Sequence, residues 1–439
     1  MKEIVRITGA GSEMQGVARL QDGRCAFVPR ALPGESAEIE IARDMGRYVL
    51  SRTVRILEKS PERREPACPY YDICGGCSAQ HMTYGLSLRL KRQRVFDALE
   101  RIGGIANPHL QDTVGMENPY RSRRKAEYLV RGEKIGCARA GSREIVEIDD
   151  CLLQHPESVR VLRAVRSFLQ AHSIPELRFV VTRVNARAEC MVVLSFEGKH
   201  FDMRLAQSLA GAIARDCESV VSVFFCRLRA GYAHALDGAC ERRIGARVIH
   251  DGLLGVSFVL SPQSFFQVNP PQAERLFSVA GDMAQLSGKE TLVDVYCGAG
   301  AIALTLAKRA ARVYGIEIVP EAIADANRNA KENGLSETCR FLTGDAGTVL
   351  PELVRKGVTP HVMTVDPPRK GLDSAVIETA LSVLPERIVY ISCNPATLAR
   401  DIKKLCETGA YRYEHGTPVD MFPWTEHVET VVLLSRAKE

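Results

Sequence analysis

The sequence lacks any long hydrophobic run. Its longest apolar stretches, such as residues 220–226, are far shorter than the about 18 residues that a membrane span needs. Its first residues, Met-Lys-Glu-Ile-Val-Arg, lack the apolar segment of a secretory signal. Internal repeats and low-complexity tracts are also missing, and a hydrophobic content of 46% excludes global disorder. We therefore expect a soluble, cytoplasmic protein without a membrane partner, long enough at 439 residues for two or three domains.

Cysteine, in contrast, is abundant, with 14 in the chain. In a long chain without a secretory signal, this points to metal binding or catalysis rather than to disulfides. Cys68, Cys74 and Cys77 form a Cys-x5-Cys-x2-Cys set on a glycine-rich loop, and Cys151 is the best candidate for a fourth ligand. Four thiolates suit either an iron–sulfur cluster or zinc, and the spacing does not separate the two. The alternative is a set of reduced cysteines that meet by chance.

Positive charge is concentrated in one segment. Residues 120–143 contain eight basic and two acidic side chains, a net of +6, which leaves −1 for the rest of a chain whose total is +5. Its densest part consists of Arg121, Arg123, Arg124 and Lys125. A second basic group lies at residues 89–94, and localised positive charge is the footprint of a nucleic-acid-binding surface. An ordinary solvated face is the alternative, but two basic groups near a metal-like cysteine set favour nucleic acid.

The first part of the chain, residues 1–58, consists of short β-like runs separated by Gly and Pro turns. The predicted strands are 3–8, 15–20, 25–28, 36–41 and 48–56. Strands this closely spaced, without a helical period, indicate a small barrel of the kind that binds oligonucleotides. A polar stretch with two prolines then predicts a linker at residues 60–66. Residues 67–260 carry the cysteines, a helical period over 86–101 and mixed strands and helices.

In residues 262–439, strands and helices alternate. The predicted strands are 291–296, 313–317, 340–343, 361–365, 388–392, 411–416 and 428–434, and the predicted helices are 302–308 and 320–333. Alternation with short connections implies a parallel sheet flanked by helices and closed by an antiparallel pair. The fold class is therefore α/β, with a Rossmann-like C-terminal domain that follows a small β-barrel and a mixed α+β domain.

A glycine turn follows the first strand of the C-terminal domain. It contains Tyr296, Gly298 and Gly300, and it lets the backbone turn tightly where the next helix offers free N–H groups to a ligand. Glu317, at the end of the second strand, could bind two ribose hydroxyls, and Asp345, after the third, could meet an adenine amino group. The turn lacks the third glycine of the dinucleotide fingerprint, which favours S-adenosylmethionine over NAD. The alternative is a turn with incidental glycines.

Cys393 ends a later strand of the same domain. Because Pro395 cannot continue the strand, the thiol lies at the carboxyl edge of the sheet, where open α/β folds bind ligands. A cysteine at a strand end is more often an inert core residue. The Asp366-Pro-Pro-Arg369 loop at the neighbouring strand edge favours a functional thiol. Asp366 could contact the cofactor or a base, while Arg369 could bind a phosphate or lower the thiol pKa.

This arrangement suits a reaction at a pyrimidine ring. Carbon 5 of uracil is too weak a nucleophile to take a methyl group directly, but thiolate addition at carbon 6 makes an enolate that can attack a sulfonium methyl. A base must then remove the proton on carbon 5 so that the thiolate can leave. Glu426, His427 and Glu429 lie at the start of a late strand, and we choose Glu429. Glu426 could equally be a solvated turn residue, and His427 a structural hydrogen bonder.

With these residues, the chain resembles the RNA (uracil-5-)methyltransferase family, specifically the branch that modifies 23S ribosomal RNA. The resemblance runs over nearly the whole length and implies a TRAM barrel, a [4Fe-4S] cluster on the four cysteines, Cys393 as nucleophile and Glu429 as general base. It also implies contacts with S-adenosylmethionine around the glycine turn. The implied contact residues are Gln267, Tyr296, Gly298, Glu317, Asp345 and Asp366. Gln267 lies beside aromatic residues that could be plain core.

We therefore expect a 23S rRNA (uracil-5-)-methyltransferase that acts as a monomer. The related tRNA-modifying branch lacks both the barrel and the cluster, which argues against a tRNA substrate. Another interpretation is an iron–sulfur RNA-binding protein without activity, which only Ala301 favours, because some family members carry asparagine there. A third is an NAD-dependent dehydrogenase.

Overall fold

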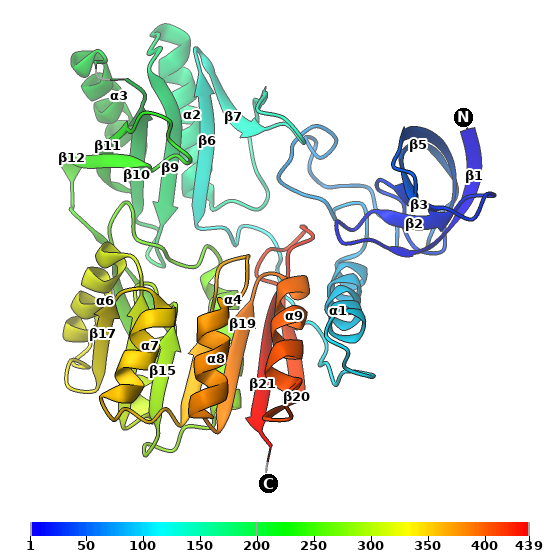
Figure 1. The fold of residues 1–439 in the computed structure, drawn as a ribbon. Coiled ribbons are helices and arrows are strands. Elements are labelled where there is room, and N and C mark those ends of the chain that lie inside the picture. Colours follow the sequence, from blue (N-terminus) through cyan, green and yellow to red (C-terminus); the bar gives the residue numbers. More distant parts are fainter. Residues whose placement is uncertain (1, 199, 438–439) are drawn as a thin grey trace.

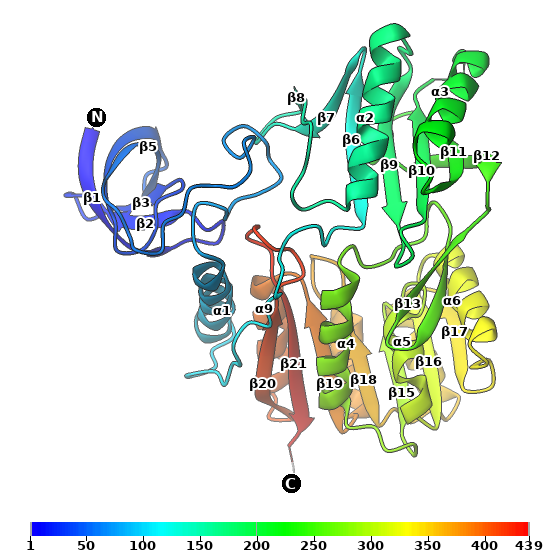
Figure 2. The same ribbon diagram turned by 180° about the vertical axis from the view of Figure 1, so that it is seen from behind.

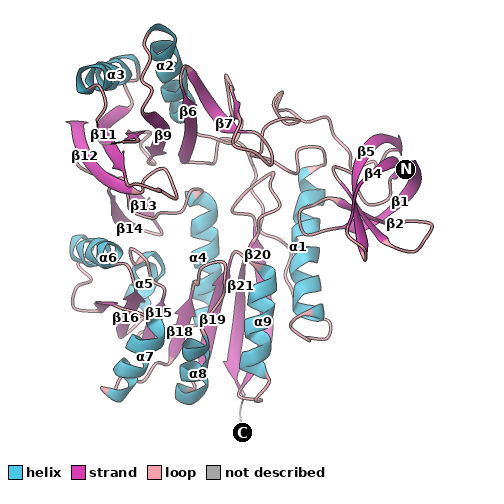
Figure 3. Cartoon of the chain, turned by 45° about the horizontal axis from the view of Figure 1, so that its top comes forward, coloured by secondary structure: helices cyan, strands magenta, loops and turns pink. Residues whose placement is uncertain are grey.

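The structure is a computed structural model, and it describes residues 2–198 and 200–437. A small barrel, a central sheet with helices and a C-terminal sheet with helices follow one another along the chain (Figure 1). Loops join these three parts in the middle of the molecule (Figure 3). Within the described residues, no helix combines the length and the apolar character needed to cross a membrane.

The N-terminal part is a closed barrel in the order β1-β2-β3-β5-β4. Its strands are β1 (Lys2–Ala10), β2 (Gly16–Arg19), β3 (Cys25–Val28), β4 (Ser36–Asp44) and β5 (Tyr48–Glu58). Alternate side chains such as Val5 and Ile7 are buried in the barrel core, as the period of two in a strand requires. The predicted barrel and its five strands are confirmed.

Turns and one helix connect the barrel to the rest. Residues 59–83 lead into α1 (Tyr84–Arg101), where Thr83 caps the helix by accepting a hydrogen bond from the Leu86 N–H at 3.2 Å. The buried face of α1 includes Val95 and Leu99, which pack in the same core as α9. The helix therefore contributes to the C-terminal part, although it precedes it by about 170 residues in sequence.

The central sheet has the order β12-β11-β10-β9-β6-β7-β8. Its strands are β6 (Lys125–Arg131), β7 (Lys134–Ala138), β8 (Ile145–Val146), β9 (Leu177–Val184), β10 (Cys190–Phe196), β11 (Val220–Leu228) and β12 (Gly238–Gly245). The helices α2 (Pro156–Ala171) and α3 (Met203–Asp216) bury their apolar faces on it. A separate hairpin, β13 (Ile249–Leu253) and β14 (Val256–Leu260), packs in the core of the C-terminal part. We retain 1–58, 67–260 and 262–439 as a proposed division along the sequence.

The C-terminal sheet has the order β17-β16-β15-β18-β19-β21-β20, with parallel pairing up to β19 and antiparallel pairing beyond it. Its strands are β15 (Thr291–Val295), β16 (Arg312–Glu317), β17 (Cys339–Thr343), β18 (Val362–Val365), β19 (Arg387–Ser392), β20 (Tyr411–Val419) and β21 (Glu429–Arg436). The order reverses between β15 and β18, and such a switch point places a ligand crevice at the carboxyl ends of the strands. The predicted α/β fold is confirmed.

Helices cover both faces of this sheet. One face is covered by α4 (Pro270–Ala284), α5 (Ala301–Leu306), the short 3-10 helix η1 (Ala307–Arg309) and α6 (Pro320–Glu332). The other is covered by α7 (Ala346–Arg355), α8 (Ser374–Val383), α9 (Pro395–Cys406) and α1. Figure 1 looks onto the side of α7, α8 and α9, and Figure 2 onto the side of α4 and α5. The crevice edge is thus left to the loops that follow the strands.

Candidate active site

Three side chains of the predicted catalytic set lie at one edge of the C-terminal sheet. Asp366 directly follows β18, and Cys393 directly follows its neighbour β19. Because β21 runs antiparallel to β19, with Ser392 opposite Thr430, its first residue Glu429 lies at this same edge. All three side chains are partly buried. Strand order and direction therefore bring together residues that are up to 63 positions apart in sequence.

The two carboxyl groups of this edge hold their protons unusually tightly. Burial raises the pKa of Glu429 to about 8, with a further contribution from the negative charge of Asp366 and an opposing one from Arg369. Burial also raises the pKa of Asp366 to about 7, helped by Asp294. A carboxyl group with a pKa near neutral pH is suited to act as a general base, because it can both take up and release a proton.

The same neighbouring charges affect the pKa of the Cys393 thiol. Its pKa is raised by burial first, and then by the negative charges of Glu429 and Asp366, while the Arg369 guanidinium lowers it. Arg369 is the group of this set that favours the thiolate, which is the nucleophilic form of cysteine. The sequence interpretation that Arg369 could lower the thiol pKa therefore has a physical basis in the structure, although burial outweighs it.

The glycine turn after β15 has the backbone conformation that its residues predict. Tyr296, Gly298 and Gly300 have φ values of 67°, 53° and 84°, all in the left-handed region. A Cβ atom on Gly300 would also come within 3.0 Å of the Phe341 ring. The turn brings backbone N–H groups to the edge of the sheet: the Gly298 N–H donates to the Glu317 carboxylate at 3.2 Å.

The other predicted cofactor residues surround this turn. A second backbone N–H, that of Val319, donates to Glu317 at 3.0 Å, so the carboxylate is held at the end of β16. Asp345 is exposed at the start of α7, directly after β17, and Gln267 is partly buried just before α4. Sequence analysis missed Asp294, which is buried and accepts hydrogen bonds from Thr364 and from the Ala303 N–H. An acidic residue inside an otherwise apolar strand is the sequence feature that could have indicated this buried carboxyl group.

Side chains of α1 hold the segment that leads to Glu429. Lys91, counted above within a basic group, is fully buried, pairs with Asp420 and donates to the Phe422 carbonyl at 2.9 Å. The Tyr84 hydroxyl donates to the same Asp420 carboxylate at 2.6 Å. Lys91 falls between Leu88 and Val95 on the helical period, and that position on an apolar face was the sequence signal for burial.

The four predicted cluster cysteines line one cavity. Cys68, Cys74, Cys77 and Cys151 share it with a fifth cysteine, Cys137, which sequence analysis missed. Within residues 2–198 and 200–437, no three His, Cys, Asp or Glu side chains are arranged to hold a single metal ion. A [4Fe-4S] cluster binds its thiolates through different iron atoms, so four thiols that face one cavity fit its donor set. The cluster stays a prediction.

The four predicted RNA-binding residues fall into two pairs. Arg121 donates to both oxygens of Asp150, at 2.8 and 2.6 Å, and Arg124 faces the buried Asp251 at 3.3 Å. Arg123 and Lys125, in contrast, line the cavity that contains the cysteines. Alternate residues of an extended segment point to opposite sides, which separates Arg123 and Lys125 from Arg124.

This cavity has a volume of about 1170 Å³ and reaches from the barrel to the catalytic edge. Its lining includes Phe27 and Arg30 of the barrel, the cysteine-rich turns, and Arg369 and His427 from the loops around Cys393 and Glu429. All three parts of the chain thus contribute to one hollow surface, which is larger than the about 300–1,000 Å³ of an ordinary small-molecule pocket.

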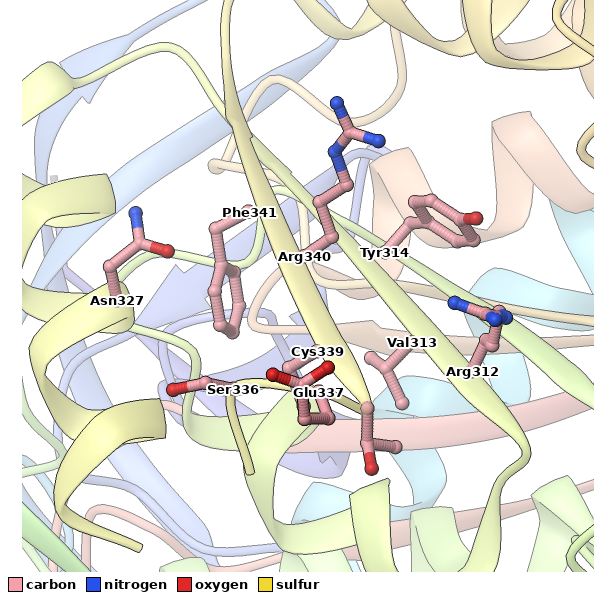
Figure 4. A pocket seen from close by; sticks show the side chains of 10 residues that line it. Arg312, Val313, Tyr314, Asn327, Ser336, Glu337, Cys339, Arg340 and Phe341 are labelled. Carbon is pink, nitrogen blue, oxygen red and sulfur yellow. The ribbon is translucent and has the colours of Figure 1, made fainter. Parts of the chain in front are cut away.

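A second cavity, of about 340 Å³, lies at the edge of the same sheet between β16 and β17 (Figure 4). It is lined by Arg312, Val313, Tyr314, Asn327, Ser336, Glu337, Thr338, Cys339, Arg340 and Phe341. Apart from Asn327 of α6, these residues are the first three of each strand and the turn before β17. The predicted catalytic residues lie at the opposite edge, where the parallel strands end, so the two sites are separate.

Comparison with known proteins decides the family. Family models match residues 350–437 (tRNA (Uracil-5-)-methyltransferase), 292–375 (methyltransferase domain) and 3–54 (TRAM domain). An uncharacterized RNA methyltransferase of Halalkalibacterium halodurans is 41% identical over 435 residues, which cover 95% of this chain and 93% of its own. The chain belongs to the RNA (uracil-5-)-methyltransferase family. It is an S-adenosylmethionine-dependent RNA methyltransferase with an N-terminal TRAM barrel.

Two further comparisons describe this methyltransferase. An uncharacterized RNA methyltransferase of Caldanaerobacter subterraneus subsp. tengcongensis is 41% identical over 447 residues, covering 98% of this chain and 97% of its own. The solved structure of the Pyrococcus abyssi tRNA (uracil-54, C5)-methyltransferase, in complex with S-adenosyl-L-homocysteine, matches with a TM-score of 0.76 and 26% identity. It covers 99% of this methyltransferase and 100% of its own chain. Because this match includes the residues of the barrel, the Pyrococcus abyssi enzyme does not support the expectation that a tRNA-modifying relative lacks the barrel.

Proposed function

We propose that this methyltransferase modifies carbon 5 of uridine through a covalent bond between Cys393 and carbon 6. The observation that carries the proposal is the meeting of Cys393, Asp366 and Glu429 at one sheet edge, next to the glycine turn. The Cys393 thiolate adds to carbon 6, and the electron pair moves to carbon 5, which forms the new bond to the methyl carbon. The sulfur–methyl bond of the donor would break in exchange, and its electron pair would stay on the sulfur of the departing thioether. Glu429 then takes the proton from carbon 5, the double bond re-forms and the thiolate leaves.

S-adenosylmethionine supplies an electrophilic methyl group when it is bound. Glu317 is suited to hold the ribose hydroxyls, because two backbone N–H groups already fix its carboxylate. Ile318, directly after it, is 62% exposed and offers an apolar surface to an adenine ring. Asp345 would accept a hydrogen bond from the adenine amino group, while Tyr296 and Gly298 bring the turn close to the cofactor. Gln267 and Asp366 would contact the cofactor or the base.

We propose 23S ribosomal RNA as the substrate, in a monomeric cytoplasmic enzyme. The support is the combination of the TRAM barrel with the cysteine set, which resembles the 23S branch of the family. A tRNA is the second candidate, because a tRNA (uracil-54) methyltransferase matches the whole chain. Methylation assays with 23S rRNA and tRNA transcripts, followed by mass spectrometry of the products, separate the two. Methyluridine in tRNA alone would contradict the ribosomal assignment.

We further propose that Cys68, Cys74, Cys77 and Cys151 hold a [4Fe-4S] cluster. Their shared cavity supports this set, and a fifth cysteine of the same cavity, Cys137, lies against Cys74. Protein purified without oxygen should be brown and contain iron and sulfide. A colourless protein that contains zinc would contradict the cluster.

The covalent mechanism is tested with RNA that carries 5-fluorouridine at the target position. Fluorine cannot leave as a proton does, so the Cys393 adduct is trapped after methyl transfer. A stable protein–RNA adduct supports the enzyme mechanism. If saturating cofactor gives no adduct and no methylated product from natural RNA, the non-catalytic RNA-binding protein is the better interpretation.

A further inference from the structure

The cysteine-rich turns contact the catalytic segment directly. We call residues 68–82 the cysteine loop and residues 420–429 the catalytic segment. The Ser78 hydroxyl donates to the Glu426 carboxylate at 2.6 Å. The backbone N–H groups of Ser78 and Ala79 both donate to the Trp424 carbonyl at 3.0 Å. Three hydrogen bonds therefore connect the residue that follows Cys77, and its neighbour, to the segment that ends in Glu429.

The contact point on the catalytic segment is a fixed and strained residue. Trp424 has a φ of 63°, a conformation that is rare for a bulky side chain. Its indole is buried between the rings of Tyr84 and Tyr120, at centroid distances of 5.3 and 5.4 Å. A backbone held in this conformation persists only where its surroundings determine it. The two N–H donors of the cysteine loop are part of these surroundings.

Glu426 extends this link toward the general base. It precedes Glu429 by three residues, and its own carbonyl accepts a hydrogen bond from Arg94 of α1 at 2.8 Å. Its side chain is thus held by the cysteine loop and its backbone by α1. Both contacts act on the path of the chain just before β21 begins at Glu429.

We propose that Ser78 is a positioning residue for Glu429, and that the cysteine loop thereby holds the general base in place for proton removal. This inference rests on the proposed function, because it takes Glu429 as the base. It gives the cysteine loop a role in the second half of the reaction, beyond any contact that it makes with RNA. A general base must lie within hydrogen-bond reach of its proton, so a small displacement of the segment slows this step.

The nucleophile is positioned independently of Ser78. The Asn394 side chain donates to the Arg369 carbonyl at 3.0 Å, and its N–H donates to the Ser392 hydroxyl at 3.1 Å. These bonds tie the turn of Cys393 to the loop after β18. Loss of the Ser78 hydroxyl should therefore leave addition of Cys393 unchanged and slow the release of the methylated product.

The test separates these two steps in the full-length protein, purified without oxygen. Ser78→Ala is compared with Ser78→Thr, which keeps the hydroxyl, and with Ser287→Ala. Ser287 is a matched control, since its hydroxyl also donates to a carboxylate, that of Glu290, at 2.7 Å, near the opposite edge of the sheet. Rapid quenching with natural RNA measures formation and decay of the adduct on denaturing gels.

In Ser78→Ala we expect adduct decay to slow by about tenfold or more, because general-base catalysis is worth about 10²- to 10⁴-fold when the base is well placed. Adduct formation should change by less than about twofold. Ser78→Thr should restore decay, and Ser287→Ala should behave as the wild type. Equal slowing of both steps, or no slowing of decay, would overturn the positioning role. Absence of any adduct in the wild-type protein with 5-fluorouridine RNA would instead refute the proposed function.

A second readout does not depend on activity. Trp424 is the one tryptophan of the sequence, so the intrinsic tryptophan fluorescence reports on the catalytic segment. If Ser78 fixes this segment, acrylamide should quench the emission more strongly in Ser78→Ala than in the wild type, Ser78→Thr or Ser287→Ala. Identical quenching in all four proteins would contradict the link between the cysteine loop and the catalytic segment.

Discussion

The catalytic edge and the basic segment of residues 120–143 were both predicted as groups of neighbouring side chains. In the structure, the catalytic side chains lie together and the basic side chains are separated. At the catalytic edge, Asp366, Cys393 and Glu429 meet although they come from three strands. In the basic segment, Arg123 and Arg124 are adjacent in sequence, yet one lines the large cavity and the other pairs with Asp251.

The difference shows what backbone topology can and cannot determine. At the catalytic edge, the position of each residue follows from the end of its strand, and the sheet order then sets the neighbours. In the basic segment, whether a cation is paired or available to RNA depends on which carboxylate lies opposite it. Asp251 is 127 residues away from Arg124, and no local pattern indicates that they meet. Charge density along the sequence therefore overstates the charge available to RNA.

The largest expected effect concerns the nucleophile at the catalytic edge. Cys393→Ala should lower turnover by at least about 10³-fold, because covalent catalysis is then lost, while RNA affinity stays within a few-fold of the wild type. Methyl transfer from labelled cofactor measures the first, and filter binding the second. Cys406→Ala, a partly buried cysteine at the end of α9, is the control and should stay active. A large loss of RNA binding in Cys393→Ala would show that the edge was misassigned.

The next effect tests the partner of the thiol at the same edge. Glu429→Gln keeps the shape of the side chain but removes the base, so the methylated adduct should accumulate and turnover should fall by about 10²-fold or more. Denaturing gels with labelled RNA would reveal the trapped protein. Normal turnover in this variant would place the base elsewhere in the catalytic segment.

The pH dependence provides an intermediate test. Since Glu429 must be ionised to accept a proton and its pKa is raised to about 8, adduct decay should quicken with rising pH and level off above about 8. The same shift affects stability. The folded protein holds this proton above the ordinary pKa of 4.5, so its contribution to stability is present at low pH and is lost as the pH rises through about 8.

Glu429→Gln removes that dependence. The melting temperature of the variant, relative to the wild type, should therefore increase over the same pH window, from about 4.5 to about 8. Thermal unfolding across a pH series measures it. A difference in melting temperature that does not change with pH would show that burial does not raise the pKa of Glu429. The pH dependence of adduct decay would then need another titrating group.

Much of this architecture could be predicted from periodicity and turn chemistry. Pro320 at the start of α6 and Gly334 just after its end marked that helix within one residue. The place of α1 could not be predicted. Its apolar face, with Val95 and Leu99, indicates that the helix is buried, but it does not indicate which part of the chain covers that face. Ser78 was equally hidden, since its partner Glu426 lies 348 residues further along the chain.

The smallest expected effect concerns the cations of the basic segment and sharpens the comparison with the catalytic edge. Arg123→Ala and Lys125→Ala should each lower the slope of log affinity against log salt by about 1, because each removes a cation that can release a counterion from RNA. Arg124→Ala is the matched control. It breaks the pair with the buried Asp251, so it should lower the melting temperature and leave the salt slope unchanged. Equal slopes for Arg123→Ala and Arg124→Ala would mean that the large cavity is not the RNA-binding surface, and the separation of the two arginines would then lose its functional meaning.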